Sequence, residues 1–210
     1  MRVMIADDHD ILRRGVRMLI EARGDLRVVA EASTGREALA LALETKPDIA
    51  IIDYALPELN GRDLTVALKK ELPKLEVLIY TIHNREEAIV EVLQAGARAF
   101  VLKSDTERHL LAAIDALSLR RPYFSGAISE ALVDQLLRGK SKATLTALTD
   151  RERQVVQLVA EGKLNKQIAD ILEISIKTVE THRTSVMQKL NLRTTAELVR
   201  YAIRNNIAEA

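Results

Sequence analysis

The chain has 210 residues, enough for one large domain or two smaller ones, and it contains no cysteine, which excludes disulfides and thiolate metal sites. Its net charge of +1 is unevenly divided. Residues 1–120 hold 17 Lys and Arg against 20 Asp and Glu, and residues 141–210 hold 11 against 8, so the C-terminal part is the one suited to a nucleic-acid partner.

No apolar stretch approaches the roughly 18–20 residues that a membrane helix needs. Two aspartates within the first eight residues leave no room for the apolar core of a signal peptide. We therefore expect no membrane partner. The absence of cysteine fits a reducing compartment, and we expect the protein in the cytoplasm.

Short apolar runs alternate with helical patterns in the first half of the chain. The runs cover residues 3–6, 28–30, 49–52, 77–79 and 99–102. Between them, apolar residues recur at three-to-four spacing, as at Leu12, Val16 and Leu19. Five strand–helix units predict an α/β domain with a doubly wound, five-stranded parallel sheet, covered on both faces and joined by right-handed crossovers.

The second half contains no strand-like run and predicts a small all-α domain. Thr149 and Glu152 form a capping-box pattern, and Ser175 is a second candidate cap. We expect domain limits of 1–118 and 145–210. Residues 119–144 would be a linker that begins at a break in helix periodicity and contains a short amphipathic helix, with these residues on one face: Ile128, Leu132 and Leu136.

Polar side chains follow the predicted strands of the first half. Asp7 and Asp8 follow the first strand, Asp53 the third, Thr81 the fourth and Lys103 the fifth. Ligands of an open parallel sheet gather beyond the carboxyl ends of its strands, so these side chains are expected to converge on one edge. The alternative is that they are helix caps and solvated loop residues, since Asp is a favoured cap.

Three carboxylates in one cleft repel each other unless some are protonated or a cation joins them. With only oxygen ligands, a hard divalent ion such as Mg²⁺ is the expected occupant. Such an ion would neutralise an incoming phosphoryl group while the carboxylate of Asp53 attacks it. Lys103 would pair with a phosphoryl oxygen, and Thr81 would donate a hydrogen bond to another.

These residues resemble the pattern of a response-regulator receiver domain with a flavodoxin-like fold. The resemblance covers residues 1–118 and includes an Asp-x-x-x-Pro-x-x-x-Gly motif that begins at Asp53. It implies that a cognate histidine kinase phosphorylates Asp53, with at most slow self-dephosphorylation and no other catalytic activity.

The resemblance also implies a role for each pocket residue. Asp8 and Asp53 would bind Mg²⁺ directly, Asp7 would bind through water, and the backbone carbonyl of Ala55 would be a further ligand. Phe100 occupies the position of an aromatic switch residue. It is expected to rotate inward when Thr81 moves.

Three closely spaced helices are predicted within residues 149–192. Gly162 ends the first, a short second helix follows, and the third runs from about Ile176 to Lys189 after a tight turn. This is the helix-turn-helix arrangement, in which the later helix enters the major groove. Hydroxyl and amide side chains on the outer face of the third helix suit base edges and phosphates, although a solvated polar face is the alternative.

Residues 146–208 resemble a LuxR-type helix-turn-helix, and the whole chain is similar to the NarL/FixJ class of response regulators. The resemblance implies that four residues face the DNA groove: Lys177, Glu180, Thr181 and Thr184. It makes three others candidate phosphate contacts: Thr178, Arg183 and Lys189. It implies a dimer contact on the last helix through Leu198, Ala202 and Ile203.

The sequence thus predicts a phosphorylation-controlled transcription regulator that forms a homodimer on double-stranded DNA when phosphorylated. One rival is an α/β phosphatase-like enzyme, which is disfavoured because the residues after Asp53 lack the second aspartate of such enzymes and no phosphate-binding glycine loop occurs. Another rival is a receiver that acts by protein contact alone. The linker would permit the unphosphorylated receiver to cover the recognition helix, but the sequence does not decide whether it does.

Overall fold

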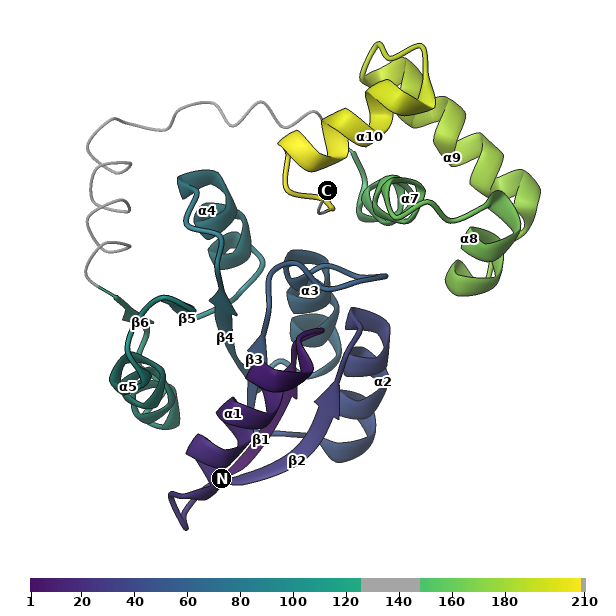
Figure 1. Ribbon diagram of the computed structural model, residues 1–210. Helices are drawn as coiled ribbons and strands as arrows, with labels where there is room; N and C mark the ends of the chain where they lie inside the picture. Colours follow the sequence, from purple (N-terminus) through teal and green to yellow (C-terminus); the bar gives the residue numbers. More distant parts are fainter. Residues whose placement is uncertain (126–147, 209–210) are drawn as a thin grey trace.

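The computed structural model describes residues 1–125 and 148–208 in two domains (Figure 1). The predicted amphipathic helix in the linker lies outside the described residues, as does most of the linker itself. The elements of the N-terminal domain are β1 (Arg2–Ala6), α1 (Asp10–Glu21), β2 (Arg27–Ala32), α2 (Gly35–Thr45), β3 (Ile49–Ile52), α3 (Gly61–Glu71), β4 (Glu76–Thr81), α4 (Glu86–Gln94), β5 (Ala99–Leu102), α5 (Glu107–Ser118) and β6 (Tyr123–Phe124).

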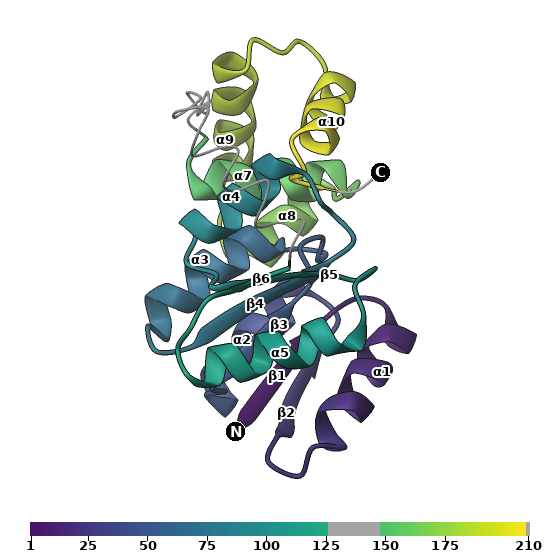
Figure 2. The same ribbon diagram turned by 90° about the vertical axis from the view of Figure 1, so that its left-hand side faces the viewer.

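The strands form one parallel sheet in the order β2-β1-β3-β4-β5-β6. Alternate strand residues point to opposite faces, and each face has its own apolar core. Met4 and Ile52 lie in the core beneath α2, α3 and α4, whereas Val3 and Ile51 lie in the core beneath α1 and α5. Figure 2 shows α1 and α5 together on one side of the sheet. The predicted doubly wound parallel sheet is confirmed.

The sheet has a sixth strand where the sequence predicted five. Tyr123 donates a backbone hydrogen bond to the carbonyl of Arg98 (3.0 Å), and Phe124 pairs with Phe100 of β5. The expectation of five strands was wrong because a two-residue strand has no periodicity to detect. Phe124 is held there by packing against the core of the α2–α4 face, a contact that only the tertiary structure supplies.

The C-terminal domain contains helices and, within its described residues, no strand. They are α7 (Asp150–Ala160), α8 (Asn165–Leu172), α9 (Ile176–Lys189) and α10 (Thr195–Arg204). The capping box of Thr149 and Glu152 is present at the start of α7, and Ser175 caps α9 by accepting from the backbone N–H of Thr178. The bounds of α9 match the predicted third helix.

The two domains meet through α7 and the segment after α10, which face the end of β3 and the start of α3 (Figure 1). Four outer residues of α9 remain exposed with both domains present: Lys177, Glu180, Thr181 and Thr184. The N-terminal domain therefore does not cover this face of α9, a question that the sequence left open. No helix within residues 1–125 and 148–208 is long and apolar enough to cross a membrane.

Candidate functional site

An acidic pocket lies at the carboxyl edge of the sheet. Single ligand atoms of Asp7, Asp8, His9 and Asp53 all lie within 4.8 Å of one another. Asp7 and Asp53 are buried, while Asp8 is exposed. His9 was not predicted. Its Nδ1 lies 2.8 Å from a carboxylate oxygen of Asp8, and the only available signal was its position directly after the aspartate pair.

Lys103 closes the pocket from β5. Its Nζ lies 2.6 Å from Oδ2 of Asp53 and 2.8 Å from Oδ2 of Asp7. Burial alone would lower the pKa of Lys103, but the charge of Asp53 and the hydrogen bonds to Asp53 and Asp7 raise it. The lysine therefore stays cationic and balances part of the carboxylate charge.

The pocket has the chemistry that a hard divalent cation requires. Asp53 Oδ1 is buried and accepts no hydrogen bond from the described residues, so one oxygen of the central carboxylate has no partner among them. Carboxylate oxygens are the ligands that Mg²⁺ prefers. Ala55 follows Asp53 in the same loop and lines a cavity together with Asp8. The residues present thus fit Mg²⁺.

Thr81, at the end of β4, and Phe100, in the neighbouring strand β5, are fully buried. The hydroxyl of Thr81 accepts a hydrogen bond from the backbone N–H of His83 (3.3 Å). The ring of Phe100 already belongs to the core of the α2–α4 face. The pleat of β5 points Phe100 into that core in this structure, and its rotation on phosphorylation stays a prediction.

The loop between β3 and α3 folds back over the end of β3 at a glycine. A Cβ at Gly61 would lie 2.5 Å from the carbonyl oxygen of Asp53, and Gly61 donates its N–H to the carbonyl of Tyr54 (2.7 Å). The glycine of the Asp53 motif is therefore required by this close approach. Asn60 caps α3 by accepting from the N–H of Asp63.

Tyr54, next to Asp53, connects the pocket to the surface of α4. Its ring is buried, and its hydroxyl lies 3.4 Å from Oε2 of Glu91. Burial, followed by the charge of Glu91, raises the pKa of the Tyr54 hydroxyl, which stays protonated. The imidazole ring of His83 lies 5.7 Å from the Tyr54 ring, centroid to centroid.

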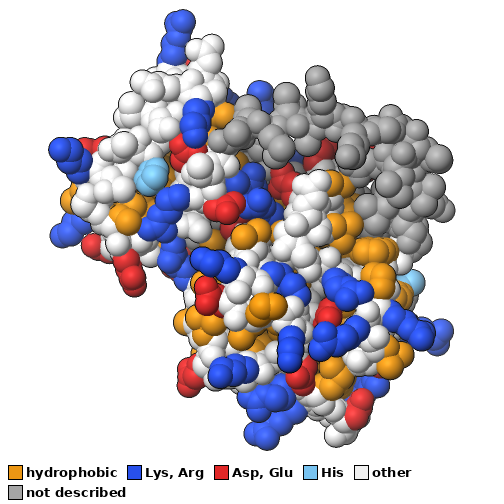
Figure 3. All heavy atoms as spheres, turned by 180° about the vertical axis from the view of Figure 1, so that it is seen from behind, with side chains coloured by type: hydrophobic (Ala, Val, Ile, Leu, Met, Phe, Trp, Pro, Cys, Tyr) orange, Lys and Arg blue, Asp and Glu red, His pale blue; other side chains and the backbone are white. Residues whose placement is uncertain are grey.

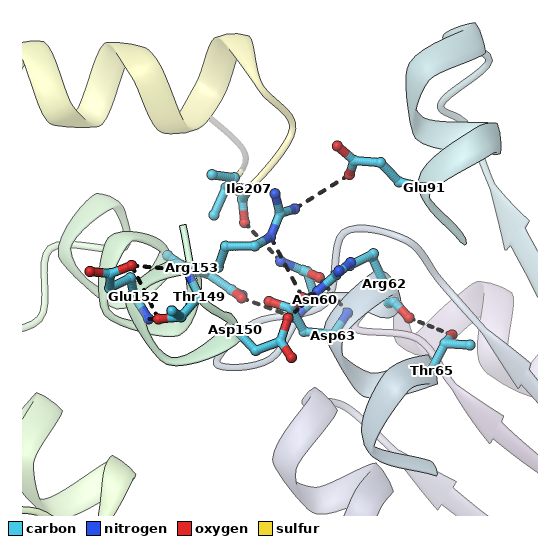
Figure 4. A network of polar contacts seen from close by, with 12 residues as sticks. Asn60, Arg62, Asp63, Thr65, Glu91, Thr149, Asp150, Glu152, Arg153 and Ile207 are labelled. Atoms are coloured by element: carbon cyan, nitrogen blue, oxygen red, sulfur yellow. Dashed lines mark hydrogen bonds and ion pairs between the residues drawn. The ribbon is translucent and has the colours of Figure 1, made fainter. Parts of the chain in front are cut away.

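Charged side chains join the two domains beside this loop (Figure 4). Arg153 of α7 lies 3.3 Å from Glu91 and 3.6 Å from Asp63, and Arg62 lies 2.7 Å from Asp150. Sequence reasoning missed this network, because pairs between residues some 60–90 positions apart leave no local pattern.

Two cavities adjoin the pocket. One, of about 570 Å³, lies between the domains and is lined by residues of both, including Asp8, Ala55, Gln157 and Glu161. The other, of about 620 Å³, is a largely apolar groove between α1 and α5, and Asp53 opens into it. The acidic pocket is therefore reached from two sides, and the C-terminal domain forms a wall of only one.

The predicted DNA-contact residues differ in whether their side chains are exposed or are bound to other residues of the domain. The four groove-facing residues are exposed, as described above. Arg183 is held by Asn165 (2.6 Å) and Thr195 (3.2 Å), and Lys189 by Glu152 (2.8 Å), so both serve the packing of the domain. Lys and Arg side chains lie interspersed with Asp and Glu on the face of the domain seen in Figure 3.

The predicted dimer contact needs correction. Leu198 and Ala202 are 1% and 0% exposed and belong to the core that α10 shares with α7. They cannot contact a second copy, because their apolar stripe is already covered within the domain. Ile203 is half-buried and lines the cavity between the domains.

Comparison with known proteins identifies both halves. The response regulator receiver domain model matches residues 3–115, and the model for bacterial regulatory proteins of the luxR family matches residues 146–202. The chain is 34% identical to the oxygen regulatory protein NreC of Staphylococcus epidermidis over 217 residues and to that of Staphylococcus aureus over 216 residues, with 100% of each chain covered.

Solved structures of the response regulator RcsB have the same two-domain organisation. RcsB in complex with DNA matches with a TM-score of 0.61 and 27% identity, over 96% of each chain. RcsB from Salmonella enterica serovar Typhimurium, bound to a promoter in the presence of a phosphomimetic, matches with a TM-score of 0.63 and 28% identity, over 96% of this chain and 97% of that one. The chain belongs to the NarL/FixJ-class response regulators, transcription regulators controlled by phosphorylation that join a receiver domain to a LuxR-type DNA-binding domain.

Proposed function

We propose that Asp53 is the phosphoacceptor and that a cognate histidine kinase is the donor. The observation that supports this most directly is the unpartnered, buried Oδ1 of Asp53 beside two further carboxylates and Lys103. The P–N bond of a phosphohistidine would break as a P–O bond to Asp53 forms.

Each pocket residue has a part in this transfer. Mg²⁺, held by Asp8, Asp53 and the carbonyl of Ala55, with Asp7 acting through water, would supply positive charge opposite the phosphoryl oxygens. Lys103 would exchange its bond to Asp53 for one to a phosphoryl oxygen. The Thr81 hydroxyl would release the N–H of His83 and donate to the phosphoryl group, which moves the loop after β4.

The docked arrangement of the domains is proposed as the resting state. Asp53 carries the transferred group in a pocket whose neighbour Tyr54 contacts Glu91, and Glu91 contacts Arg153 of the other domain. A phosphoryl group adds about −1.5 to −2 charge, enough to rearrange a charged contact of this kind. Phosphorylation would thereby release the C-terminal domain.

The released domain would dimerise through the exposed face of α10 rather than through its buried one. Ala196, Val199, Arg200 and Ile203 recur at helical spacing and are exposed or half-buried. Since Ile203 also lines the cavity between the domains, docking and dimerisation would compete for this residue. A structure described as two RcsB dimers on two parallel DNAs supports a dimer as the DNA-bound form.

A double-stranded promoter site is the proposed ligand of α9. Because promoter DNA lies in the cytoplasm of bacteria, the protein would act there. Phosphorylation with acetyl phosphate and Mg²⁺ is expected to tighten binding to such DNA by about tenfold or more, a usual size for coupling between two sites. Fluorescence anisotropy with DNA selected from genomic fragments would measure it, with sedimentation run on the same samples. Equal affinity with and without acetyl phosphate would refute the proposed control.

Lys177→Ala is expected to weaken DNA binding by about 1–3 kcal/mol, because an exposed cation at the start of α9 is lost from the groove. Anisotropy titrations at several salt concentrations would show the loss, with the salt slope reduced by about 1 if Lys177 contacts a phosphate. Lys70→Ala removes the same charge from an exposed site on α3 and should leave affinity unchanged. An equal loss in both variants would exclude a specific contact.

A further inference from the structure

Two side chains of the C-terminal domain hold the backbone of the loop between β3 and α3. The side chain of Gln157 donates to the carbonyl of Leu56 and accepts from the N–H of Asn60, both at 2.9 Å. Glu161, one turn later, accepts from the N–H of Glu58 at 3.0 Å and from Gln157 at 2.8 Å. Gln157 is 1% exposed, so these bonds lie inside the junction of the domains.

The loop has a strained shape where it is held. Glu58 has a φ of 67°, in the left-handed region that is unfavourable for residues other than glycine. The N–H of this same residue is the one bound by Glu161. The C-terminal domain therefore helps to keep the loop in a conformation that its own sequence disfavours.

This loop also bears a proposed metal ligand. Ala55 immediately precedes Leu56, whose carbonyl is bound by Gln157. Ala55 and Asp8 line the same cavity as Gln157 and Glu161, so the two domains form opposite walls of the space beside the acidic pocket. Both hydrogen bonds of the Glu161 carboxylate are to Oε1, and Oε2 accepts none from the described residues. Lys163 also lines the cavity, and its positive charge offsets the negative charge of Glu161. The effect of this wall on the pocket therefore depends on how it holds the loop rather than on its net charge.

We propose that docking of α7 and binding of a divalent cation in the acidic pocket strengthen each other before any phosphorylation, with Gln157 and Glu161 as positioning residues for the carbonyl of Ala55. A ligand group that is already held in place loses less conformational entropy when the ion binds. Coupling between two sites is reciprocal, so the ion must then stabilise the docked domains by the same factor. This inference rests on the metal site of the proposed function.

The test uses Mn²⁺ as the probe cation and the full chain, with no phosphoryl donor and no DNA. Free Mn²⁺, measured by electron paramagnetic resonance, gives its dissociation constant. Gln157→Ala and Glu161→Ala, which remove the side-chain atoms that hold the loop, are each expected to weaken Mn²⁺ binding about fivefold, at the lower end of usual coupling. Asp170→Asn removes one exposed negative charge from α8 and should bind as the wild type does.

The reciprocal effect is measured by hydrogen exchange. Mn²⁺ is expected to slow exchange of the Glu58 and Asn60 amides in the wild type, and to do so less in Gln157→Ala. Circular dichroism checks that each variant is folded. Wild-type Mn²⁺ affinity in both junction variants, or tighter binding, would overturn the proposal while leaving the phosphoacceptor role of Asp53 untouched. No Mn²⁺ binding by the wild type would overturn both this inference and the metal site.

Discussion

Asp53→Asn is expected to abolish phosphorylation of this protein. The wild type, incubated with acetyl phosphate and Mg²⁺, should gain one phosphoryl group per chain, and the variant none. The replacement keeps the shape of the side chain but removes the carboxylate, whose Oδ1 is the buried, unpartnered oxygen of the pocket. Intact-mass measurement gives the result directly, and sedimentation of the same samples should show a shift toward dimer in the wild type alone.

Asp115→Asn is the matched control, since it removes one carboxylate from an exposed position on α5, where the partner of Asp115 is Arg23. This variant should be phosphorylated like the wild type. An adduct of equal amount on Asp53→Asn would place the phosphoacceptor elsewhere. No adduct on any of the three proteins would contradict the phosphorelay function, and the control of DNA binding would then have to come from a ligand or a partner.

Glu152→Ala is expected to destabilise the C-terminal domain by about 2 kcal/mol, because a buried carboxylate that caps α7 is lost and its hydrogen-bond partners are left unsatisfied. Glu152 is 4% exposed and accepts from Ser185 (2.7 Å), Lys189 (2.8 Å) and the N–H of Thr149 (2.8 Å). It thus fastens α9 to the start of α7. Urea unfolding followed by circular dichroism would measure the loss.

Asp170→Ala, an exposed change on α8, should shift stability by no more than about 0.5 kcal/mol.

The pH dependence of the stability of the C-terminal domain provides an independent check of the role of Glu152. Burial would raise the pKa of Glu152, but its bonds to Lys189, Ser185 and Thr149 lower it from about 4.5 to about 2. The contribution of Glu152 to the free energy of unfolding is therefore complete above pH 4.5 and is lost as the pH falls toward 2. Glu152→Gln should remove that part of the acid sensitivity. An unchanged acid transition would contradict the role of the ion pair.

The sequence by itself determined the elements and the pocket of this protein. Short continuous apolar runs specified β1 to β5. The carboxyl ends of parallel strands must meet, so the positions of Asp7, Asp53 and Lys103 directly after their strands were enough to bring the three side chains together. Caps such as Thr149 and Ser175 depend only on neighbours in the chain, and these were predicted correctly too. Local rules and one topological rule were sufficient for all of this.

Only the tertiary structure decided which partner covers each surface. The apolar stripe of α10 is visible in the sequence, but its period does not say whether α7 or a second copy covers it, and Leu198 and Ala202 proved to be core. β6 and the bonds of Gln157 to the β3–α3 loop likewise depend on residues distant in the chain. Periodicity records that a face is buried, whereas the identity of what buries it depends on long-range packing.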